Sequence, residues 1–326
     1  MAETANIAKM AEILSKDLFS EFLWERVGPI NWNWSCEESE VHKIKTHPSD
    51  VVFYYDEPYT AVRTYVNCDL KSYGKATINL NSVKTALDDL ALTLTCAEKS
   101  DEWRAKYIHP HISPEICGLL FVYNHDGEYN KDFNKLLNQI KHVALNIPKK
   151  SKIVVLGPED IHWLNNVRYQ IIHMRGSKSL PERNDFRYFY PHLARKKNVQ
   201  WDKAKAATLE MLTAPWIILS YSFPNSPSRK WVVIFYRREG KSVEEFLYLI
   251  DYLLHYQVLV EDTDIHIKIY QPHENAHSCF EKAIHQYIEQ CQGGQTIEAR
   301  LKSIKFEKLE AIHHQFSLLQ IGMKHD

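Results

Sequence analysis

The sequence predicts an α/β protein built in two parts, and three observations carry this prediction. Apolar residues recur at helical spacing in some segments and form short runs rich in β-branched and aromatic residues in others. The two kinds of segment alternate along the chain, which is the pattern of a sheet flanked by helices. The chain has 326 residues, 44% of them hydrophobic, which is enough for one large domain or two ordinary ones.

Residues 8–26 predict an amphipathic helix, because Leu14, Leu18 and Phe22 recur at helical spacing and Gly28-Pro29 would end it. Two strands joined by a turn are expected next, since Asp, Glu and Pro at 56–58 are turn-forming residues. The elements expected after the first helix are strands over 50–55 and 62–71, a helix over 82–96, a buried strand over 117–123 and a helix over 132–145.

A strand over 153–156 follows the basic run at 149–152, and it either continues the first sheet or opens a second unit. We place the boundary before it, so that residues 1–148 form the first domain and residues 149–326 form a second α/β domain. Ser242 and Glu245 have the spacing of a capping box. The elements expected in the second domain are strands over 216–222, 231–236 and 264–270, with helices over 243–256 and 276–291.

The overall charge excludes some functions. The 40 basic and 41 acidic side chains give a net charge of −1. A protein that bound nucleic acid over its whole surface would be basic. If this protein binds nucleic acid, a local basic patch or a partner must make the contacts. No phosphate-binding glycine loop occurs, so the chain is not expected to be an ATPase itself. The N-terminus has no signal-peptide pattern, and no long apolar run occurs, so we expect a soluble, cytoplasmic protein.

Cysteines and histidines give no strong metal signal in the sequence. The six cysteines are widely spaced without a C-x-x-C pair, which disfavours a zinc ribbon and predicts buried free thiols. The 17 histidines are scattered, with His109 and His111 as the tightest pair, and H-E-x-x-H is absent. A histidine metal site is therefore also disfavoured.

The strongest functional signal is the expected hairpin. Asp50 opens its first strand, and Asp69 and Lys71 close its second. Asp50 and Asp69 are equally far from the turn, so in an antiparallel pair they face each other, with Cβ atoms about 4.5–5.5 Å apart. Two carboxylates at such a short distance repel each other, and a divalent cation between them removes the repulsion. This pattern predicts a metal site.

Strand alternation puts Lys71 on the same face as Asp69, about 7 Å along the strand. A lysine in this place can orient or deprotonate a water molecule, or stabilise negative charge on a phosphate. A metal ion beside it can polarise a phosphate and activate water. The hairpin therefore predicts that the protein cleaves a substrate with the help of a metal ion. A surface ion pair between Asp69 and Lys71 is the alternative reading.

Asp50 followed by Asp69-Leu70-Lys71 on a paired strand resembles the signature of the PD-(D/E)xK nuclease superfamily, and Pro48-Ser49-Asp50 is similar to its Pro-Asp element with one residue inserted. The resemblance covers about the first 145 residues, and the second acid is Asp where Glu is commoner. It implies a restriction-endonuclease-like mixed sheet flanked by helices. It also implies Mg²⁺- or Mn²⁺-dependent hydrolysis of phosphodiester bonds, most often of DNA, in restriction, repair or anti-phage defence.

The resemblance also implies a further acid on the first helix. Glu21 is the best match, because it shares the inward face of Leu14 and Leu18, and Glu25 is the weaker candidate. Lys75 could compete with Lys71 for the role of the lysine. The alternative function is an inactive copy of the fold that binds protein or nucleic acid within a complex.

A second candidate region lies at 175–205, where nine basic residues stand against three acids and aromatic residues are interleaved. Basic side chains neutralise phosphates, and aromatic rings stack on unpaired bases. A solvated loop held by its aromatic residues is the alternative. The nucleic-acid contacts expected here are Arg175, Lys178, Arg187, Arg195, Lys196 and Lys197.

Two further expectations complete the sequence-based picture. Because the chain lacks an ATPase motif, we expect a helicase or another NTPase as a partner subunit, and a homo-oligomer remains open. Glu159 and His162 follow a strand end at Gly157-Pro158, where a turn and a helix N-cap are favoured over an active-site role.

Overall fold

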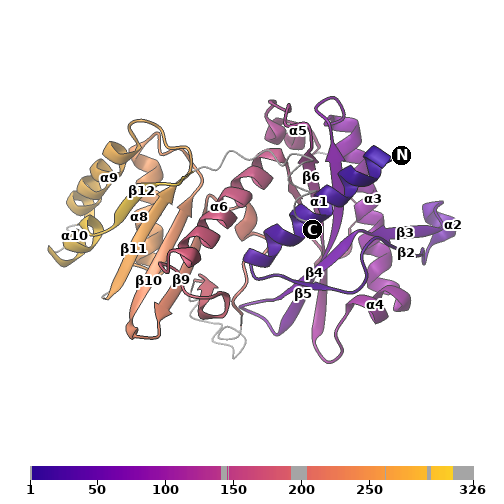
Figure 1. The fold of residues 1–326 in the computed structure, drawn as a ribbon, viewed down its shortest axis with the longest axis horizontal. Helices are drawn as coiled ribbons and strands as arrows, with labels where there is room; N and C mark the ends of the chain where they lie inside the picture. Colours follow the sequence, from indigo (N-terminus) through magenta and orange to yellow (C-terminus); the bar gives the residue numbers. More distant parts are fainter. Residues whose placement is uncertain are drawn as a thin grey trace. The chain divides into compact units, whose positions relative to one another are not determined.

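The structure is a computed structural model that describes residues 2–140, 145, 147–191, 204–260, 262–291 and 295–310. The chain divides into two compact units near residue 164 (Figure 1). We call residues up to 164 the N-terminal unit, and the described residues 165–191 and 205–310 the C-terminal unit. The two-part α/β organisation predicted from the sequence is confirmed.

The N-terminal unit is built on a five-stranded mixed sheet with the order β1-β4-β5-β6-β7. Strand β4 pairs antiparallel with β1 and β5, whereas β5–β6 and β6–β7 are parallel. The strands are β1 (Glu25–Val27), β4 (Val51–Asp56), β5 (Val62–Tyr73), β6 (Ser113–Asn124) and β7 (Ile153–Leu156). The β4–β5 hairpin is the one predicted from the sequence.

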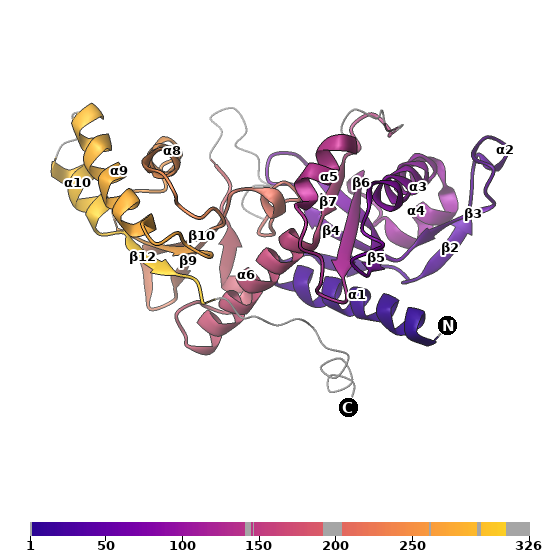
Figure 2. The same ribbon diagram turned by 90° about the horizontal axis from the view of Figure 1, so that it is seen from above.

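Helices cover both faces of this sheet (Figure 2). Helix α1 (Ala2–Glu21) packs on one face, where the Phe19 ring lies 5.3 Å from Phe53 of β4 and 6.0 Å from Phe121 of β6. The opposite face packs on α3 (Leu80–Lys99), whose Leu90 and Leu94 share a buried core with Leu120 and Val122. Helix α4 (Asp101–Tyr107) adds Trp103 to that core, and α5 (Phe133–Ile140) adds its two end residues. This helix-flanked mixed sheet is a restriction-endonuclease-like arrangement.

The first helix ends earlier than the sequence predicted. It stops at Glu21, and Leu23 adopts a left-handed backbone with φ of 63°. Trp24 then stacks on Phe19 at 4.7 Å and on Tyr55 at 5.4 Å, and residues 25–27 pair with β4 as an edge strand. Burial of Trp24 and pairing with β4 replace the additional helical turn, because such tertiary contacts outweigh local helix propensity.

A small antiparallel pair precedes β4. It consists of β2 (Trp32–Ser35) and β3 (Thr46–Ser49), which pair with Trp34 opposite His47. The short helix α2 (Ser39–His42) connects them. The sequence pattern did not predict these elements, because four-residue segments give too little periodicity.

Strand β7 settles the choice left open by the sequence. It pairs parallel with β6, Gly118 standing opposite Ile153, and so continues the first sheet. The sequence-based boundary at 148/149 therefore falls before the last strand of the first sheet. After β7, the Asp160 carboxylate accepts the Gly157 backbone N–H at 2.9 Å at the start of α6 (Pro158–Gly176). Residues 157–160 thus form the expected helix start.

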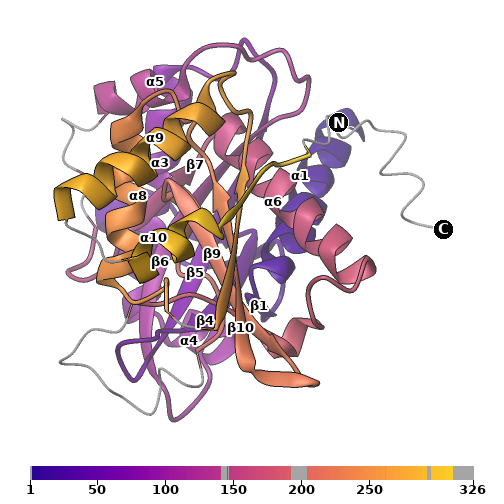
Figure 3. The same ribbon diagram turned by 90° about the vertical axis from the view of Figure 1, so that its left-hand side faces the viewer.

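The C-terminal unit contains a second five-stranded sheet, with the order β12-β11-β10-β9-β8, in which β10, β11 and β12 are parallel to one another. Helices α8, α9 and α10 lie together on this sheet (Figure 3) and share its core of Ile234, Ile267, Leu249, Phe280 and Leu301. The elements are η1 (Arg183–Asp185), β8 (Phe186–Tyr188), η2 (Met211–Thr213), β9 (Trp216–Phe223), β10 (Ser226–Tyr236), α8 (Val243–His255), β11 (Thr263–Ile269), α9 (Ala276–Cys291), α10 (Gln295–Lys302) and β12 (Lys305–Lys308).

The expected strands and helices of this unit are all present, and β8, α10 and β12 are additional. Ser242 caps α8 by accepting the Glu245 N–H at 3.4 Å. Among the helices that the structure describes, none has the length and apolar character needed to cross a membrane.

Candidate active site

Asp50 lies between β3 and β4 and is held from both sides. The preceding residue, Ser49, is fully buried, and its Oγ accepts the indole N–H groups of Trp34 and Trp103, each at 3.1 Å. The Asp50 carboxylate accepts the backbone N–H of Leu70 on β5 at 2.7 Å. Buried hydrogen bonds of this kind fix a side chain's position, so Asp50 is tied to the strand that carries Asp69 and Lys71.

The register of the hairpin is the one that the sequence predicted. Val51 of β4 stands opposite Cys68 of β5, so Asp50 and Asp69 are the next residues outward in the same register. Burial raises the pKa of Asp69, and the charge of Asp50 raises it further, so the two side chains lie close together. The two carboxyl groups therefore meet, as expected.

Lys71 completes the group. Its Nζ lies 2.7 Å from Asp69 Oδ1, and the two side chains are 30% and 15% exposed. In the β5–β6 register, Asp69 stands beside Leu120 and Lys71 beside Val122, so both face the side that α3 covers. The pair is thus half-buried at the edge of a core, unlike the solvated surface ion pair that was the alternative.

Burial dominates the electrostatics of these three groups. It raises the pKa of Asp69 to about 6, a rise that Lys71 opposes and the Asp50 charge reinforces. Burial also raises the pKa of Asp50, against the N–H of Leu70 and the charge of Lys71. Burial alone would lower the pKa of Lys71, but the charge and hydrogen bond of Asp69 outweigh it and raise that pKa. The site therefore holds two carboxyl groups that are costly to ionise and a lysine that stays charged.

Glu21 lies on a different face. It is the last residue of α1 and is only 4% exposed. Helix α1 packs through Phe19 on the Phe53 and Phe121 face, whereas Asp69 and Lys71 stand on the opposite one. The structure thus unites Asp50, Asp69 and Lys71, and the role of Glu21 as a supporting metal ligand stays a prediction.

The two weaker candidates lie elsewhere. Glu25 is exposed on edge strand β1, where its carboxylate accepts a hydrogen bond from Tyr54. Lys75 is exposed beyond the end of β5, and its backbone N–H donates to Asp126 at 2.8 Å. Of the two lysines, Lys71 is the one paired with Asp69.

The basic region is only partly described. Arg175 is half-buried in the last turn of α6, and Lys178 is exposed just after it. Arg187 lies on β8, where it lines a hollow of about 300 Å³ together with Lys205 and Lys230. Residues Arg195, Lys196 and Lys197 lie outside the described residues.

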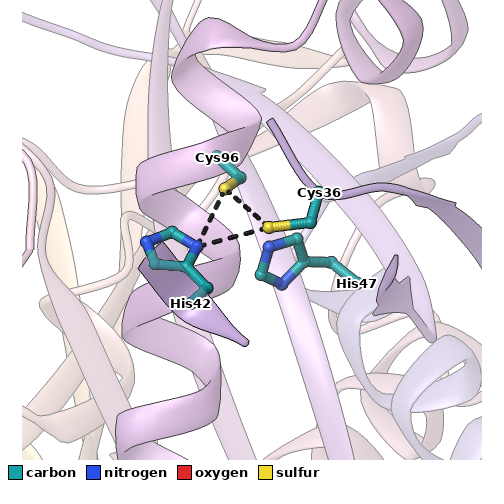
Figure 4. A group of neighbouring side chains, drawn as sticks. All are labelled: Cys36, His42, His47 and Cys96. Carbon is teal, nitrogen blue, oxygen red and sulfur yellow. Dashed lines mark hydrogen bonds between the residues drawn. The ribbon is translucent and has the colours of Figure 1, made fainter. Parts of the chain in front are cut away.

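A second cluster of side chains escaped the sequence prediction. Cys36, His42, His47 and Cys96 each direct a possible metal-ligand atom into one place, within 4.8 Å of one another (Figure 4). Three of them lie within twelve residues of sequence, which was a usable signal. The fourth comes from α3, about fifty residues further along, so no spacing rule would have joined it to the others.

The fold and the site together define the class of the N-terminal unit. A mixed sheet flanked by helices carries one acid before a strand and an Asp-x-Lys on the paired strand, which is the organisation of a PD-(D/E)xK nuclease domain. Residues 1–160 match the family described as the GAPS4 protein PD-(D/E)XK nuclease domain. The N-terminal unit belongs to the PD-(D/E)XK nuclease superfamily, as the resemblance implied. A comparison with curated proteins gave no match.

Proposed function

We propose that this protein is a metal-dependent endonuclease that cleaves DNA in anti-phage defence. The observation that supports it best is the meeting of Asp50, Asp69 and Lys71 within a domain that matches a nuclease family. A cytoplasmic setting, predicted from the sequence, belongs to the same proposal.

The donor set fits a hard divalent cation. Asp50 and Asp69 offer carboxylate oxygens, the ligands that Mg²⁺ and Mn²⁺ prefer. Burial raises the pKa of both carboxyl groups, because the protein itself supplies too little positive charge to stabilise their ionised forms. A bound cation would supply that charge. Such an ion, once bound, would polarise the scissile phosphate and lower the pKa of water. We propose Asp50 and Asp69 as its ligands, with Glu21 as a candidate third acid.

Lys71 has a separate role in this proposal. Its raised pKa keeps the ammonium group charged at neutral pH while it pairs with Asp69. A charged ammonium group beside the metal ligands can hold a phosphate oxygen and stabilise the negative charge that develops during cleavage. Lys71 therefore acts on the phosphate, and it would need to lose a proton before it could serve as a general base.

The C-terminal unit is proposed to recognise substrate or partner. Arg187, Lys205 and Lys230 bring three basic side chains to one hollow against a single acid, Asp185, and this excess of positive charge suits phosphate contacts. Arg175, Lys178 and the three basic residues at 195–197 extend this proposal. A helicase or another NTPase as partner subunit, and self-association of the chain, are further proposals based on the sequence.

An inactive binding module is the alternative function. It would keep the nuclease fold and lose the chemistry. The complete set of two carboxyl groups and a lysine favours an active enzyme, because a binding module has no need to keep two carboxyl groups that are costly to ionise side by side.

Cleavage of supercoiled plasmid and of linear DNA by the purified full chain tests the proposal. Conversion to nicked or linear product should require Mg²⁺ or Mn²⁺ and should be lost in Asp69→Asn and Lys71→Ala. The matched controls are Asp251→Asn, an exposed acid on α8, and Lys75→Ala, an exposed lysine beyond β5. Cleavage by all four variants at the wild-type rate would show that the site is misassigned. Metal binding without cleavage of any DNA or RNA would favour the inactive module.

A further inference from the structure

The second side-chain cluster is built from four separate elements of the N-terminal unit. Cys36 directly follows β2, His42 ends α2, His47 lies in β3 and Cys96 lies in α3. Cys96 is fully buried, His47 is 1% exposed and Cys36 is 9% exposed. Side chains this polar are rarely buried together unless they share a ligand or a proton.

Three of the distances within the cluster match those of a tetrahedral metal site, and the ligand atom of His47 lies within 4.8 Å of the other three. The two sulfur atoms lie 3.7 Å apart, and His42 Nδ1 lies 3.4 Å from each of them. Bonds of about 2.3 Å to sulfur and about 2.0 Å to nitrogen in a tetrahedron put two sulfurs about 3.8 Å apart and sulfur and nitrogen about 3.5 Å apart. The observed separations match these edges to within a few tenths of an ångström.

The orientation of His47 leaves one nitrogen available as a ligand. The Thr93 hydroxyl donates to the Asp89 carbonyl at 2.9 Å, so its oxygen can accept from His47 Nδ1 at 3.3 Å. This arrangement puts the ring proton on Nδ1 and the lone pair on Nε2. Among the described residues, His47 Nε2 is buried without a hydrogen-bond partner. A metal ion would supply the missing partner.

His42 is oriented in the way that metal-bound histidines commonly are. Its Nδ1 faces the two sulfurs, and its Nε2 lies 3.4 Å from the carboxylate of Glu38. A carboxylate behind a histidine fixes the ring and makes it a better ligand. Glu38 is itself held by Lys99 of α3 at 2.6 Å. The support for the cluster therefore extends beyond its four members.

We propose that Cys36, His42, His47 and Cys96 bind one structural Zn²⁺ ion. Two thiolates and two imidazoles form the soft donor set that zinc takes in closed tetrahedral sites. The oxygen donors of Asp50 and Asp69 suit Mg²⁺ instead, so the two sites differ in chemistry. The proposal of a zinc site does not depend on the proposed nuclease activity.

The ion would fasten the β2–α2–β3 segment to helix α3. Cys36, His42 and His47 all belong to that segment, and Cys96 is the ligand from the helix. His47 precedes Asp50 by three residues, so the same connection would hold the segment that positions the acid of the nuclease site. Closing long loops through one ion stabilises a fold and links metal binding to folding.

The first experiment is the metal content of the full chain, purified without chelator. Mass spectrometry of the metal should find about one zinc per chain. Replacement by Co²⁺ should give the visible absorption of a tetrahedral site together with thiolate-to-cobalt charge transfer. Prolonged chelation should lower the melting temperature, and added Zn²⁺ should restore it.

Variants identify the ligands. Cys96→Ser and His42→Ala should lose the zinc, whereas Cys117→Ser, a fully buried thiol of β6 outside the cluster, should keep it. The cobalt spectrum of the wild-type chain keeps the proposal testable if a ligand variant fails to fold. Less than roughly a tenth of a zinc per chain without a tetrahedral cobalt spectrum would overturn the proposal. A disulfide between Cys36 and Cys96 in the freshly purified protein would overturn it as well.

Discussion

Replacing Asp69 by Asn should abolish Mg²⁺ binding at the proposed nuclease site and yet stabilise the protein in the absence of Mg²⁺. In the absence of metal, the Asp69 carboxylate is costly to ionise, because burial and the nearby Asp50 raise its pKa to about 6. At pH 8 the folded protein must nevertheless hold this group ionised. Asparagine has nearly the same shape and carries no charge, so it removes that cost.

The magnitude follows from the pKa. The difference between the ordinary 3.8 and about 6, at about 1.4 kcal/mol for each tenfold change in proton affinity, is about 3 kcal/mol. This value already includes the favourable ion pair with Lys71, because that pair lowers the pKa. The Asp69 side chain is only 15% exposed, so solvent screens little of the effect. We expect the free energy of unfolding at pH 8 to rise by up to about 3 kcal/mol in the variant.

The pH dependence identifies the cause. A carboxyl group with a raised folded-state pKa binds more protons when folded, so wild-type stability falls as pH rises from 4 to 6. The gain from Asp69→Asn should therefore be small at pH 4 and complete above pH 7. Asp251→Asn, on the exposed face of α8, should show no such dependence.

The assay is urea unfolding without added Mg²⁺ or chelator at a series of pH values, repeated with Mg²⁺. Magnesium should stabilise the wild type and leave Asp69→Asn unchanged, because only the wild type keeps both ligands. A variant that is less stable than the wild type at pH 8 without Mg²⁺ would refute the electrostatic reasoning. So would a gain that is the same at pH 4 as at pH 8.

Three more outcomes are expected. Lys71→Ala should lower the cleavage rate by about 10²–10³-fold with little change in Mg²⁺ affinity. Single-turnover kinetics measures the rate and calorimetry the affinity, with Lys75→Ala as the control. An equal loss of rate in both variants would contradict the special role of Lys71. At limiting Mg²⁺, cleavage should rise with pH through about 6 as Asp69 loses its proton, and a rate that is flat from pH 5 to 8 would contradict this role. Ser49→Ala leaves two buried indole N–H donors without their acceptor and should cost about 1–3 kcal/mol in urea unfolding, whereas no loss would mean that solvent reaches them.

The local sequence pattern was sufficient to predict many of the helices and strands of this protein. The turn residues after β4 and the equal distances of Asp50 and Asp69 from the turn determined the register, because a two-strand hairpin is specified by its own sequence. The same holds for β7, α9 and the capped start of α8, whose boundaries lie within short, strongly patterned segments. Resemblance to a nuclease motif then supplied the domain class, which the family match confirms.

Tertiary structure decided the features that depend on distant residues. The packing of Trp24 on Tyr55 determines where α1 ends. The packing of Phe19 on Phe121 determines which face of the sheet α1, and with it Glu21, lies on. The raised pKa of Asp69 comes from burial against α3, which the sequence of β5 does not contain.

The limit of prediction from sequence is clearest in the cluster of Cys36, His42, His47 and Cys96. The sequence contains every ligand, and three of them are near neighbours, but Cys96 meets them only when α3 packs beside the β2–β3 pair. The sequence by itself determined the hairpin that carries the proposed chemistry. The folded chain alone decided which buried side chains meet, because burial and contact between distant segments arise only from packing.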